Sequence, residues 1–201
     1  MGHAIDCTTM KDSSIKPDLD LIKRLQQGDE VALASLMRMY YDNLYHYASR
    51  FTKDKELIKD CIQEVFISLW QRRESIGGII SPKFYLLRAI KNKTLKALHK
   101  NLSEISSHGF EEYEFLYEFS IEKIIIERQI SEEKARKLRT TLSLLSKRQQ
   151  EIIYLKYYQY LDQGQIADLM NIGRQSVYNL LHEAIQKLRS LWHEELVSNW
   201  S

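Results

Sequence analysis

The stretch LDQGQIADLMNIGRQSVYNLLHEAIQKLR, from Leu161 to Arg189, has the pattern of a helix-turn-helix. Asp162 can accept hydrogen bonds from the free amides of a first helical turn, and apolar residues follow it at the spacing of one helical face. Asn171 tolerates the left-handed backbone that ends a helix, so the first helix is expected to stop there. Gly173 then opens the second helix, which buries Val177 and Ala184 on one side.

The first turns of that second helix carry polar side chains that suit base recognition. The outward-facing residues are Arg174, Gln175, Tyr178, Asn179 and His182. Arginine, glutamine and asparagine can each present two hydrogen-bonding atoms to a base edge, and the start of the second helix is the part that enters the major groove. We therefore expect these side chains to contact DNA. The alternative is an ordinary helical hairpin with a polar outer face, which the balanced charge of this segment would suit.

The composition of the whole chain is that of a helical, globular protein. The 201 residues are 44% hydrophobic and include only 7 Gly and 2 Pro, which favours helices throughout. No apolar run is long enough to span a membrane, and the N-terminus lacks the apolar core of a signal peptide, so we expect a cytoplasmic protein. Cys7 and Cys61 have no second cysteine or histidine at ligand spacing, which argues against a disulfide framework or a zinc site.

Charge divides the chain into segments of opposite sign. Residues 19–100 contain fifteen Lys and Arg against nine Asp and Glu, whereas residues 101–133 contain two against nine. The basic part predicts a polyanionic partner. The acidic part predicts a linker, residues 101–130, that is solvated or occupies a basic groove.

The basic segment reads as a helical domain over residues 19–100, after a polar and aperiodic tail at residues 1–18. A short helix, a break at Gly28 and Asp29, and a long helix from about Glu30 are followed by a third helix over residues 55–71. Asp60, Gln63 and Glu64 lie together on one polar face of that third helix. Taken alone, this trio would be a solvated surface.

A loop with two glycines then leads to a strongly basic helix that starts at Ser81 and Pro82. Its residues to position 100 include six Lys and Arg and no acid, so the helix would repel itself unless something negative lay along it. Phosphates are the obvious candidate, and we expect nucleic-acid contact. The residues assigned to that contact are Lys83, Arg88, Lys91, Asn92 and Lys96.

Residues 131–201 form a second helical domain in this interpretation. A helix that could start at Ser120 continues toward Leu144, and another begins at Ser146 and supports the helix-turn-helix. The fold class is therefore all-α, with two small helical domains joined by an acidic linker.

With these residues assembled, the chain resembles bacterial RNA polymerase sigma factors of the sigma-70 family, in the small two-domain extracytoplasmic-function (ECF) group. DCIQEVFISLW, from Asp60 to Trp70, resembles the motif of that family's second domain. The segment from Leu142 to Arg189 resembles its fourth domain. The resemblance covers residues 19–192 in the family's order and spacing.

This resemblance implies partners and roles. Asp60, Gln63 and Glu64 match the surface that docks on the clamp-helix coiled coil of the largest subunit of core RNA polymerase. The loop at residues 72–81 and the basic helix match the part that recognises and melts promoter DNA at the minus-ten element. The residues from Arg174 to His182 match the reader of the minus-thirty-five element. A membrane-linked anti-sigma factor is a further partner that the resemblance makes plausible.

Catalysis is not expected, because no nucleophile arrangement, phosphate loop or metal cluster is evident. We accordingly expect no cofactor, no metal and no small-molecule substrate. Two alternatives to a sigma factor remain at this point. One is a stand-alone helix-turn-helix transcriptional regulator, which would usually dimerise, and the other is a helical adaptor that binds only proteins.

Overall fold

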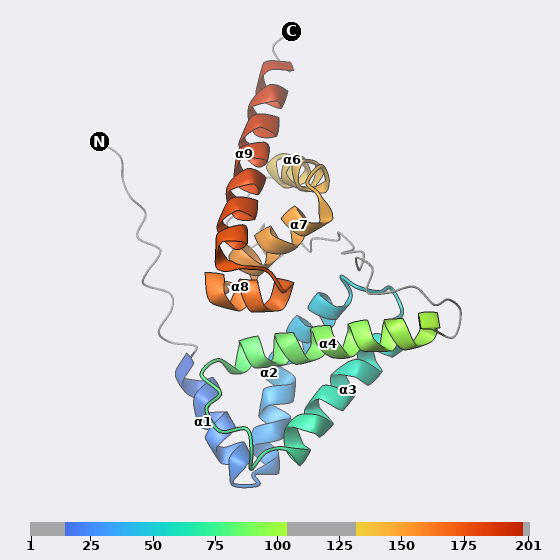
Figure 1. Ribbon diagram of the computed structural model, residues 1–201, viewed down its shortest axis with the longest axis vertical. Helices are drawn as coiled ribbons and strands as arrows, with labels where there is room; N and C mark the ends of the chain where they lie inside the picture. Colours follow the sequence, from blue (N-terminus) through green and yellow to red (C-terminus); the bar gives the residue numbers. More distant parts are fainter. Residues whose placement is uncertain (1–14, 104–131, 199–201) are drawn as a thin grey trace. The chain divides into compact units, whose positions relative to one another are not determined.

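The computed structural model describes residues 15–103 and 132–198, which fold into helices joined by short connections (Figure 1). The chain divides into two compact units, residues 1–111 and 112–201, and each is described by itself. Unit 1 contains α1 (Ile15–Gln26), α2 (Glu30–Ala48), α3 (Lys55–Gln71) and α4 (Pro82–Ser103). Unit 2 contains α6 (Glu132–Ser143), α7 (Lys147–Ile153), the π-helix η1 (Tyr154–Tyr158), α8 (Gln163–Met170) and α9 (Arg174–Ser198). The all-α prediction is confirmed. The linker was expected to start at residue 101, but α4 continues to Ser103 and takes in its first three residues. The rest of the linker, with the helix start expected at Ser120, and the tail at 1–14 lie outside the described residues.

Helix α1 begins earlier than the sequence pattern indicated. The expected tail ended at residue 18, but α1 starts at Ile15 and takes in the last four of those residues. Pro17 is tolerated because the first turn of a helix makes no use of its missing N–H. Asp18 is buried and accepts a hydrogen bond from the Tyr40 hydroxyl of α2, which ties the start of α1 into the core.

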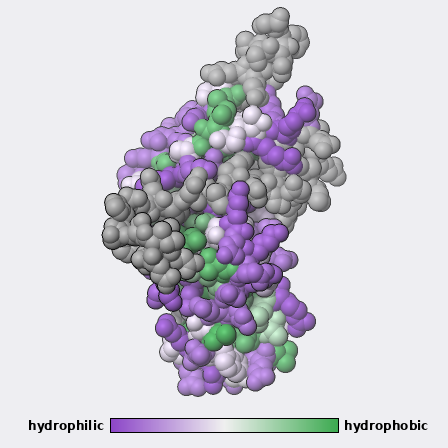
Figure 2. All heavy atoms as spheres, turned by 90° about the vertical axis from the view of Figure 1, so that its right-hand side faces the viewer, coloured by the Kyte–Doolittle hydropathy of each residue, from purple (hydrophilic) through white to green (hydrophobic). Residues whose placement is uncertain are grey.

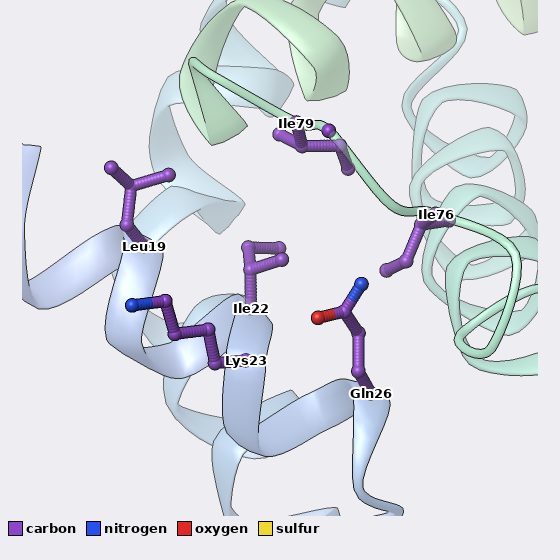
Figure 3. Close-up of a pocket in the computed structure, with 7 residues that line it drawn as sticks. Leu19, Ile22, Lys23, Gln26, Ile76 and Ile79 are labelled. Atoms are coloured by element: carbon purple, nitrogen blue, oxygen red, sulfur yellow. The ribbon is translucent and has the colours of Figure 1, made fainter.

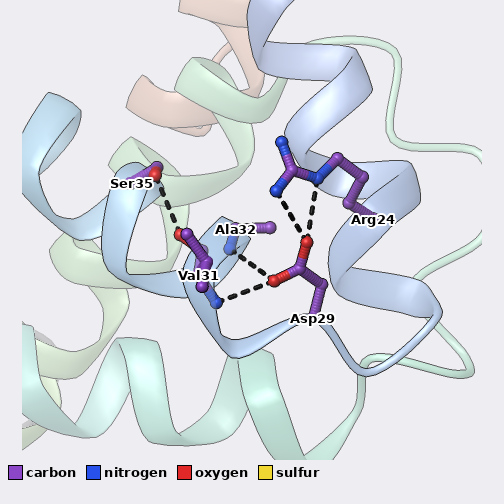
Figure 4. Close-up of polar contacts among 5 residues, drawn as sticks. All are labelled: Arg24, Asp29, Val31, Ala32 and Ser35. Carbon is purple, nitrogen blue, oxygen red and sulfur yellow. Dashed lines mark hydrogen bonds and ion pairs between the residues drawn. The ribbon is translucent and has the colours of Figure 1, made fainter.

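The corner between α1 and α2 is built by one aspartate (Figure 4). Gly28 takes φ +85° at the turn, a backbone conformation that glycine adopts without strain. Asp29 then caps α2, its Oδ1 accepting from the amides of Val31 (2.8 Å) and Ala32 (3.2 Å). Its other oxygen accepts from Arg24 Nε at 2.9 Å, and this guanidinium lowers the pKa of the carboxyl. The two helices therefore meet at a defined angle.

The same kind of local signal places α3 and α4. Asp54 caps α3 through the amides of Glu56 and Leu57, so the helix covers residues 55–71 as predicted. Ser81 accepts from the Phe84 amide at 3.3 Å, and Pro82 opens α4. One apolar stripe from each helix closes the core of unit 1. Its fully buried members include Leu25, Leu36, Leu44, Tyr47, Ile58, Ile62, Phe66, Leu69, Leu87 and Ile90.

Unit 2 is organised around α9, which packs against α6, α7 and α8. Ser146 and Gln149 form a reciprocal capping box at the start of α7, where the sequence placed a helix start. Gln150 is buried and donates from Nε2 to the carbonyl oxygens of Leu142, Ser143 and Leu145, at 3.3, 3.4 and 3.0 Å. This side chain thus adds a hydrogen-bond donor to carbonyl oxygens at and just after the end of α6, where the helical pattern of partners stops.

The helix that supports the helix-turn-helix ends differently from the expected single α-helix. After Ile153 it widens into the π-helix η1, in which the rings of Tyr154 and Tyr158 are stacked with their centres 5.0 Å apart. Tyr160 then adopts φ +54°, and the Leu161 amide donates to the Leu155 carbonyl at 3.1 Å. This hydrogen bond ends the helix, and the chain then turns toward α8. The residue in the left-handed conformation at this helix end is a tyrosine, where glycine is usual.

Within the described residues, every helix is too short or too polar to cross a bilayer. Figure 2 shows a face on which hydrophilic side chains predominate and hydrophobic ones occur in small separate groups.

Candidate functional site

Helices α8 and α9 form the helix-turn-helix that the sequence predicted. Asp162 accepts from the Gln165 amide at 2.9 Å, and Gln165 Oε1 accepts from the Asp162 amide at 3.1 Å, which starts α8. Asn171 ends it at φ 51° and ψ 51°, the left-handed conformation expected there. Ala167 of α8 is buried, α8 packs against α9, and Gly173 immediately precedes the second helix. The chain therefore presents the start of α9 at the surface.

The outer face of α9 holds all five side chains that were assigned to DNA. Arg174, Gln175, Tyr178, Asn179 and His182 are exposed. Two pairs form along this face at i, i+4 spacing. Gln175 Nε2 donates to Asn179 Oδ1 at 3.0 Å. The rings of Tyr178 and His182 are stacked, with their centres 6.3 Å apart and 12° between their planes.

Arg174 has a different position from the other four. Its guanidinium lies over the first turn of α8, where a Cβ on Gly164 would stand 3.4 Å from Nη2. A Cβ there would be in ordinary van der Waals contact with the guanidinium, which shows how close the arginine lies to α8. The cation consequently sits where the two helices of the motif begin.

Helix α4 places its basic residues on two sides. Arg88, Asn92 and Lys96 are exposed and lie four residues apart, so they form one row along the helix. Lys91 was predicted to share this surface, but its residue is only 4% exposed and its Nζ lies 5.7 Å from the centre of the Phe51 ring. Lys91 is therefore part of the interior of unit 1. It precedes Asn92 by one residue, which turns its side chain by about 100° around the helix axis, away from the exposed row.

A surface ion pair links α4 to α3. Lys93 Nζ lies 2.5 Å from Glu64 Oε2, and both side chains are partly exposed. From its sequence alone, α4 was expected to be a helix of uncompensated positive charge. The burial of Lys91 and the pairing of Lys93 reduce that charge, so the cationic surface is narrower than expected.

The polar face of α3 is exposed as predicted. Asp60, Gln63 and Glu64 all face solvent, and Ile67 continues the same face with 47% of its surface exposed. Ile67 was not predicted as part of this face, although its spacing of three residues from Glu64 and four from Gln63 was the available signal. An apolar side chain beside three polar ones is a composition typical of protein contacts.

The α3–α4 loop, residues 72–81, combines a buried anchor with an exposed tip. Ile76 is 7% exposed, whereas Ile80 is 86% exposed. Gly78 has φ +83° between them. Figure 3 shows Ile76 and Ile79 of this loop on the side that faces α1. A small pocket of about 190 Å³ lies between them and α1. Its lining residues are Leu19, Ile22, Lys23, Gln26, Ile76, Gly78 and Ile79.

Metal chemistry has no visible support in the part of the chain that the structure describes. There, no group of three or more His, Cys, Asp or Glu side chains could hold an ion. Cys61 is buried as a free thiol, and burial raises its pKa. The surfaces described above are instead suited to binding.

Two family models match the chain, one in each unit. Residues 36–103 match Sigma-70 region 2, and residues 135–188 match Sigma-70, region 4. The first match includes the α3 face, the loop and the α4 row. The second includes the helix-turn-helix.

Curated relatives match along nearly their whole length. ECF RNA polymerase sigma factor SigL of Mycobacterium tuberculosis is 27% identical over 174 residues, which are 81% of this chain and 92% of the relative. ECF RNA polymerase sigma factor SigW of Bacillus subtilis is 24% identical over 175 residues, 84% of this chain and 92% of the relative.

Solved structures share the fold. One is CnrH in complex with the cytosolic domain of CnrY, with a TM-score of 0.56 and 18% identity over 88% of this chain and 97% of that chain. Another is the sigma factor RpoE in complex with the anti-sigma factor NepR from Bartonella quintana, with a TM-score of 0.50 and 14% identity over 78% of this chain and 94% of that chain.

Proposed function

Because the chain belongs to the sigma-70 family and is an alternative sigma factor of the ECF group, we propose a division of the initiation reaction between its two units. Unit 1 binds core RNA polymerase and opens the promoter, and unit 2 recognises the upstream element. The observation that supports this assignment is the order of the two matched regions, each on its own compact unit. The surfaces of each unit then have separate tasks.

In unit 1, we assign the α3 face to the polymerase. Asp60, Gln63 and Glu64 offer hydrogen-bond acceptors and an amide, and the neighbouring Ile67 offers apolar area, which together suit the polar coiled coil of the clamp helices. Helices α3 and α4 pack against each other and are also linked by the Glu64–Lys93 ion pair, so the docking face and the DNA-contacting row lie on two packed helices.

The α4 row and the α3–α4 loop are assigned to the minus-ten element. Arg88 and Lys96 can follow the phosphates of a separated strand, and Asn92 lies between them. Lys83 at the start of α4 is partly exposed and stays with this group, whereas Lys91 does not, because it is buried. The exposed tip of the loop can reach an unstacked base while its anchor at Ile76 stays in place.

In unit 2, the outer face of α9 is assigned to the minus-thirty-five element. The helix-turn-helix geometry presents its first turns to the major groove. The segment from 161 to 193 has balanced charge, so its own attraction to phosphates is weak. High affinity for the promoter then depends on both units being bound to the same polymerase, because linked contacts reinforce each other.

The work proposed for this chain is binding without catalysis, in the cytoplasm where polymerase and promoter are. Of the two solved structures, one holds CnrH in complex with the cytosolic domain of CnrY, and the other holds the sigma factor RpoE in complex with the anti-sigma factor NepR. We extend this to the present chain and propose that an anti-sigma factor controls it.

Run-off transcription with purified core polymerase and a genomic fragment library tests the whole assignment. Discrete start sites that appear only with this protein would support it and would define both promoter elements. If the protein alone shifted a duplex but gave polymerase no new start sites, a stand-alone regulator would replace the proposal. If it did neither, a protein-binding adaptor would.

A further inference from the structure

We propose that Asn179 reads an adenine in the upstream promoter element and that Gln175 is the positioning residue that orients its amide. This inference rests on the proposed role of α9 as the promoter-reading helix. It adds which base is recognised and which atoms recognise it.

The geometry of the two amides carries the argument. Both residues are exposed in the first two turns of α9, one helical turn apart on the same face. Gln175 Nε2 donates to Asn179 Oδ1 at 3.0 Å, so this bond decides which side of the Asn179 amide carries oxygen and which carries nitrogen. An asparagine amide has two N–H donors and an oxygen with two lone pairs. One lone pair is used by Gln175, which leaves the second lone pair and both N–H groups for a base.

That remaining pattern of one acceptor beside one donor matches adenine. In the major groove adenine presents its N6 amino group as a donor and N7 as an acceptor, which an asparagine amide can bind at once. Guanine presents two acceptors there, O6 and N7, so its O6 would face the Asn179 oxygen without a shared proton. The hydrogen bond from Gln175 also polarises the Asn179 amide, which strengthens its N–H groups as donors.

The neighbouring side chains of α9 do not occupy the place of the Gln175–Asn179 amide pair, which is proposed to recognise the adenine. The Arg174 guanidinium lies over Gly164 at the start of α8, and the rings of Tyr178 and His182 stack on each other. The exposed face therefore presents one oriented amide pair beside one ring pair. An arginine that would select guanine does not stand between the two amides.

The first test uses full-length protein assembled with core polymerase and a promoter library whose upstream element is randomised. Wild-type holoenzyme should select adenine at one position by about tenfold over other bases. Asn179→Asp keeps an oxygen that accepts from Gln175 but has no donor for adenine N7. This variant should lose the adenine preference at that position and turn toward cytosine, whose N4 amino group donates to a carboxylate.

The role of Gln175 is tested by a matched pair of variants. Gln175→Ala removes the orienting bond and should lower the adenine preference several-fold without a shift toward cytosine. Gln186→Ala changes another exposed glutamine of α9 that no part of the proposal uses, and should leave the preference unchanged. Equal losses in both variants would overturn the positioning role.

A base analogue separates direct reading from an indirect effect of DNA shape. Replacing the selected adenine by 7-deazaadenine removes N7 but keeps the amino group, so wild-type binding should weaken about tenfold while Asn179→Asp binding should not change. An unchanged wild-type affinity would overturn the proposal. Failure of the sigma assignment itself would look different, because wild-type holoenzyme would then initiate at no promoter in the library.

Discussion

At the residue scale, Tyr40 links the start of α1 to the core of unit 1. Burial, and then its hydrogen bond to Asp18, raise the pKa of the Tyr40 hydroxyl far above its ordinary value. A folded-state pKa above the unfolded one means that this stabilisation is present below the unfolded pKa, about 10, and is lost as the pH rises beyond it. Denaturant unfolding at about pH 8 and pH 11 should therefore show a loss of stability at the higher pH that is smaller in Tyr40→Phe than in wild type.

The control for that prediction is Tyr41→Phe, since Tyr41 is the next residue of α2 and is 37% exposed. It should keep the wild-type pH dependence. If Tyr40→Phe lost as much stability at high pH as wild type does, the Asp18–Tyr40 bond would not be the source of the effect.

Tyr160 adopts a backbone conformation that is unfavourable for a residue with a Cβ. It occupies φ +54° just after η1, and its side chain is 68% exposed, so little packing compensates it. Tyr160→Gly should raise the free energy of unfolding by about 0.5–1 kcal/mol, because glycine has no Cβ to strain in this conformation. Denaturant midpoints measure the change.

Tyr157→Gly is the matched comparison, because Tyr157 is also exposed, at 52%, but lies inside the helix. It should lower stability by about 1 kcal/mol, since glycine is a poor helix former. A loss in both variants would mean that the Tyr160 side chain packs more than its exposure suggests.

At the element scale, α4 divides its cations between surface and interior, and this division is testable. Arg88→Gln and Lys96→Gln should each weaken promoter binding by the holoenzyme and reduce the salt dependence of binding by about one unit of slope, as expected for a cation that contacts phosphate. Promoter affinity measured across a range of salt concentrations gives the slope.

Lys91→Met serves as the contrasting variant on the same helix. Because Lys91 is buried, the effect of this change should be on the free energy of unfolding and not on DNA binding. The slope of promoter affinity against salt concentration should stay at its wild-type value. If instead Lys91→Met reduced the slope as Arg88→Gln does, the buried position would not describe the promoter-bound state.

At the scale of the whole molecule, the two units are expected to act through one polymerase. Asp60→Ala combined with Gln63→Ala should weaken binding to core polymerase about tenfold or more, because both side chains lie on the proposed docking face. Affinity for a duplex carrying the upstream element should not change, since α9 is untouched. Fluorescence anisotropy with labelled protein measures both.

The control is Asp20→Ala combined with Gln27→Ala, which changes the same residue types at one exposed position in α1 and one just after it. This variant should bind polymerase as wild type does. Wild-type polymerase binding by the Asp60 and Gln63 variant would remove the α3 face from the proposal.

Local signals were sufficient for most of the helices and for much of the candidate site. The starts of α3, α4, α7 and α8 were predicted because each cap is a hydrogen bond between residues two or three positions apart. Asn171 was predicted as a helix end for the same reason, since its left-handed backbone is a property of one residue. The outward faces of α3 and α9 followed from helical spacing alone.

The sequence by itself thus determined most helix starts, the helix-turn-helix and the family resemblance, because each depends on local motifs in the chain, whereas the early start of α1 and the π-helix η1 were not predicted. The tertiary structure decided what depends on distant partners. It placed Lys91 inside and paired Lys93 with Glu64, and it joined Asp18 to Tyr40, which extends α1 into the expected tail. The physical reason is that helical periodicity gives the direction of a side chain, whereas its burial and its partner depend on which other helix packs against it.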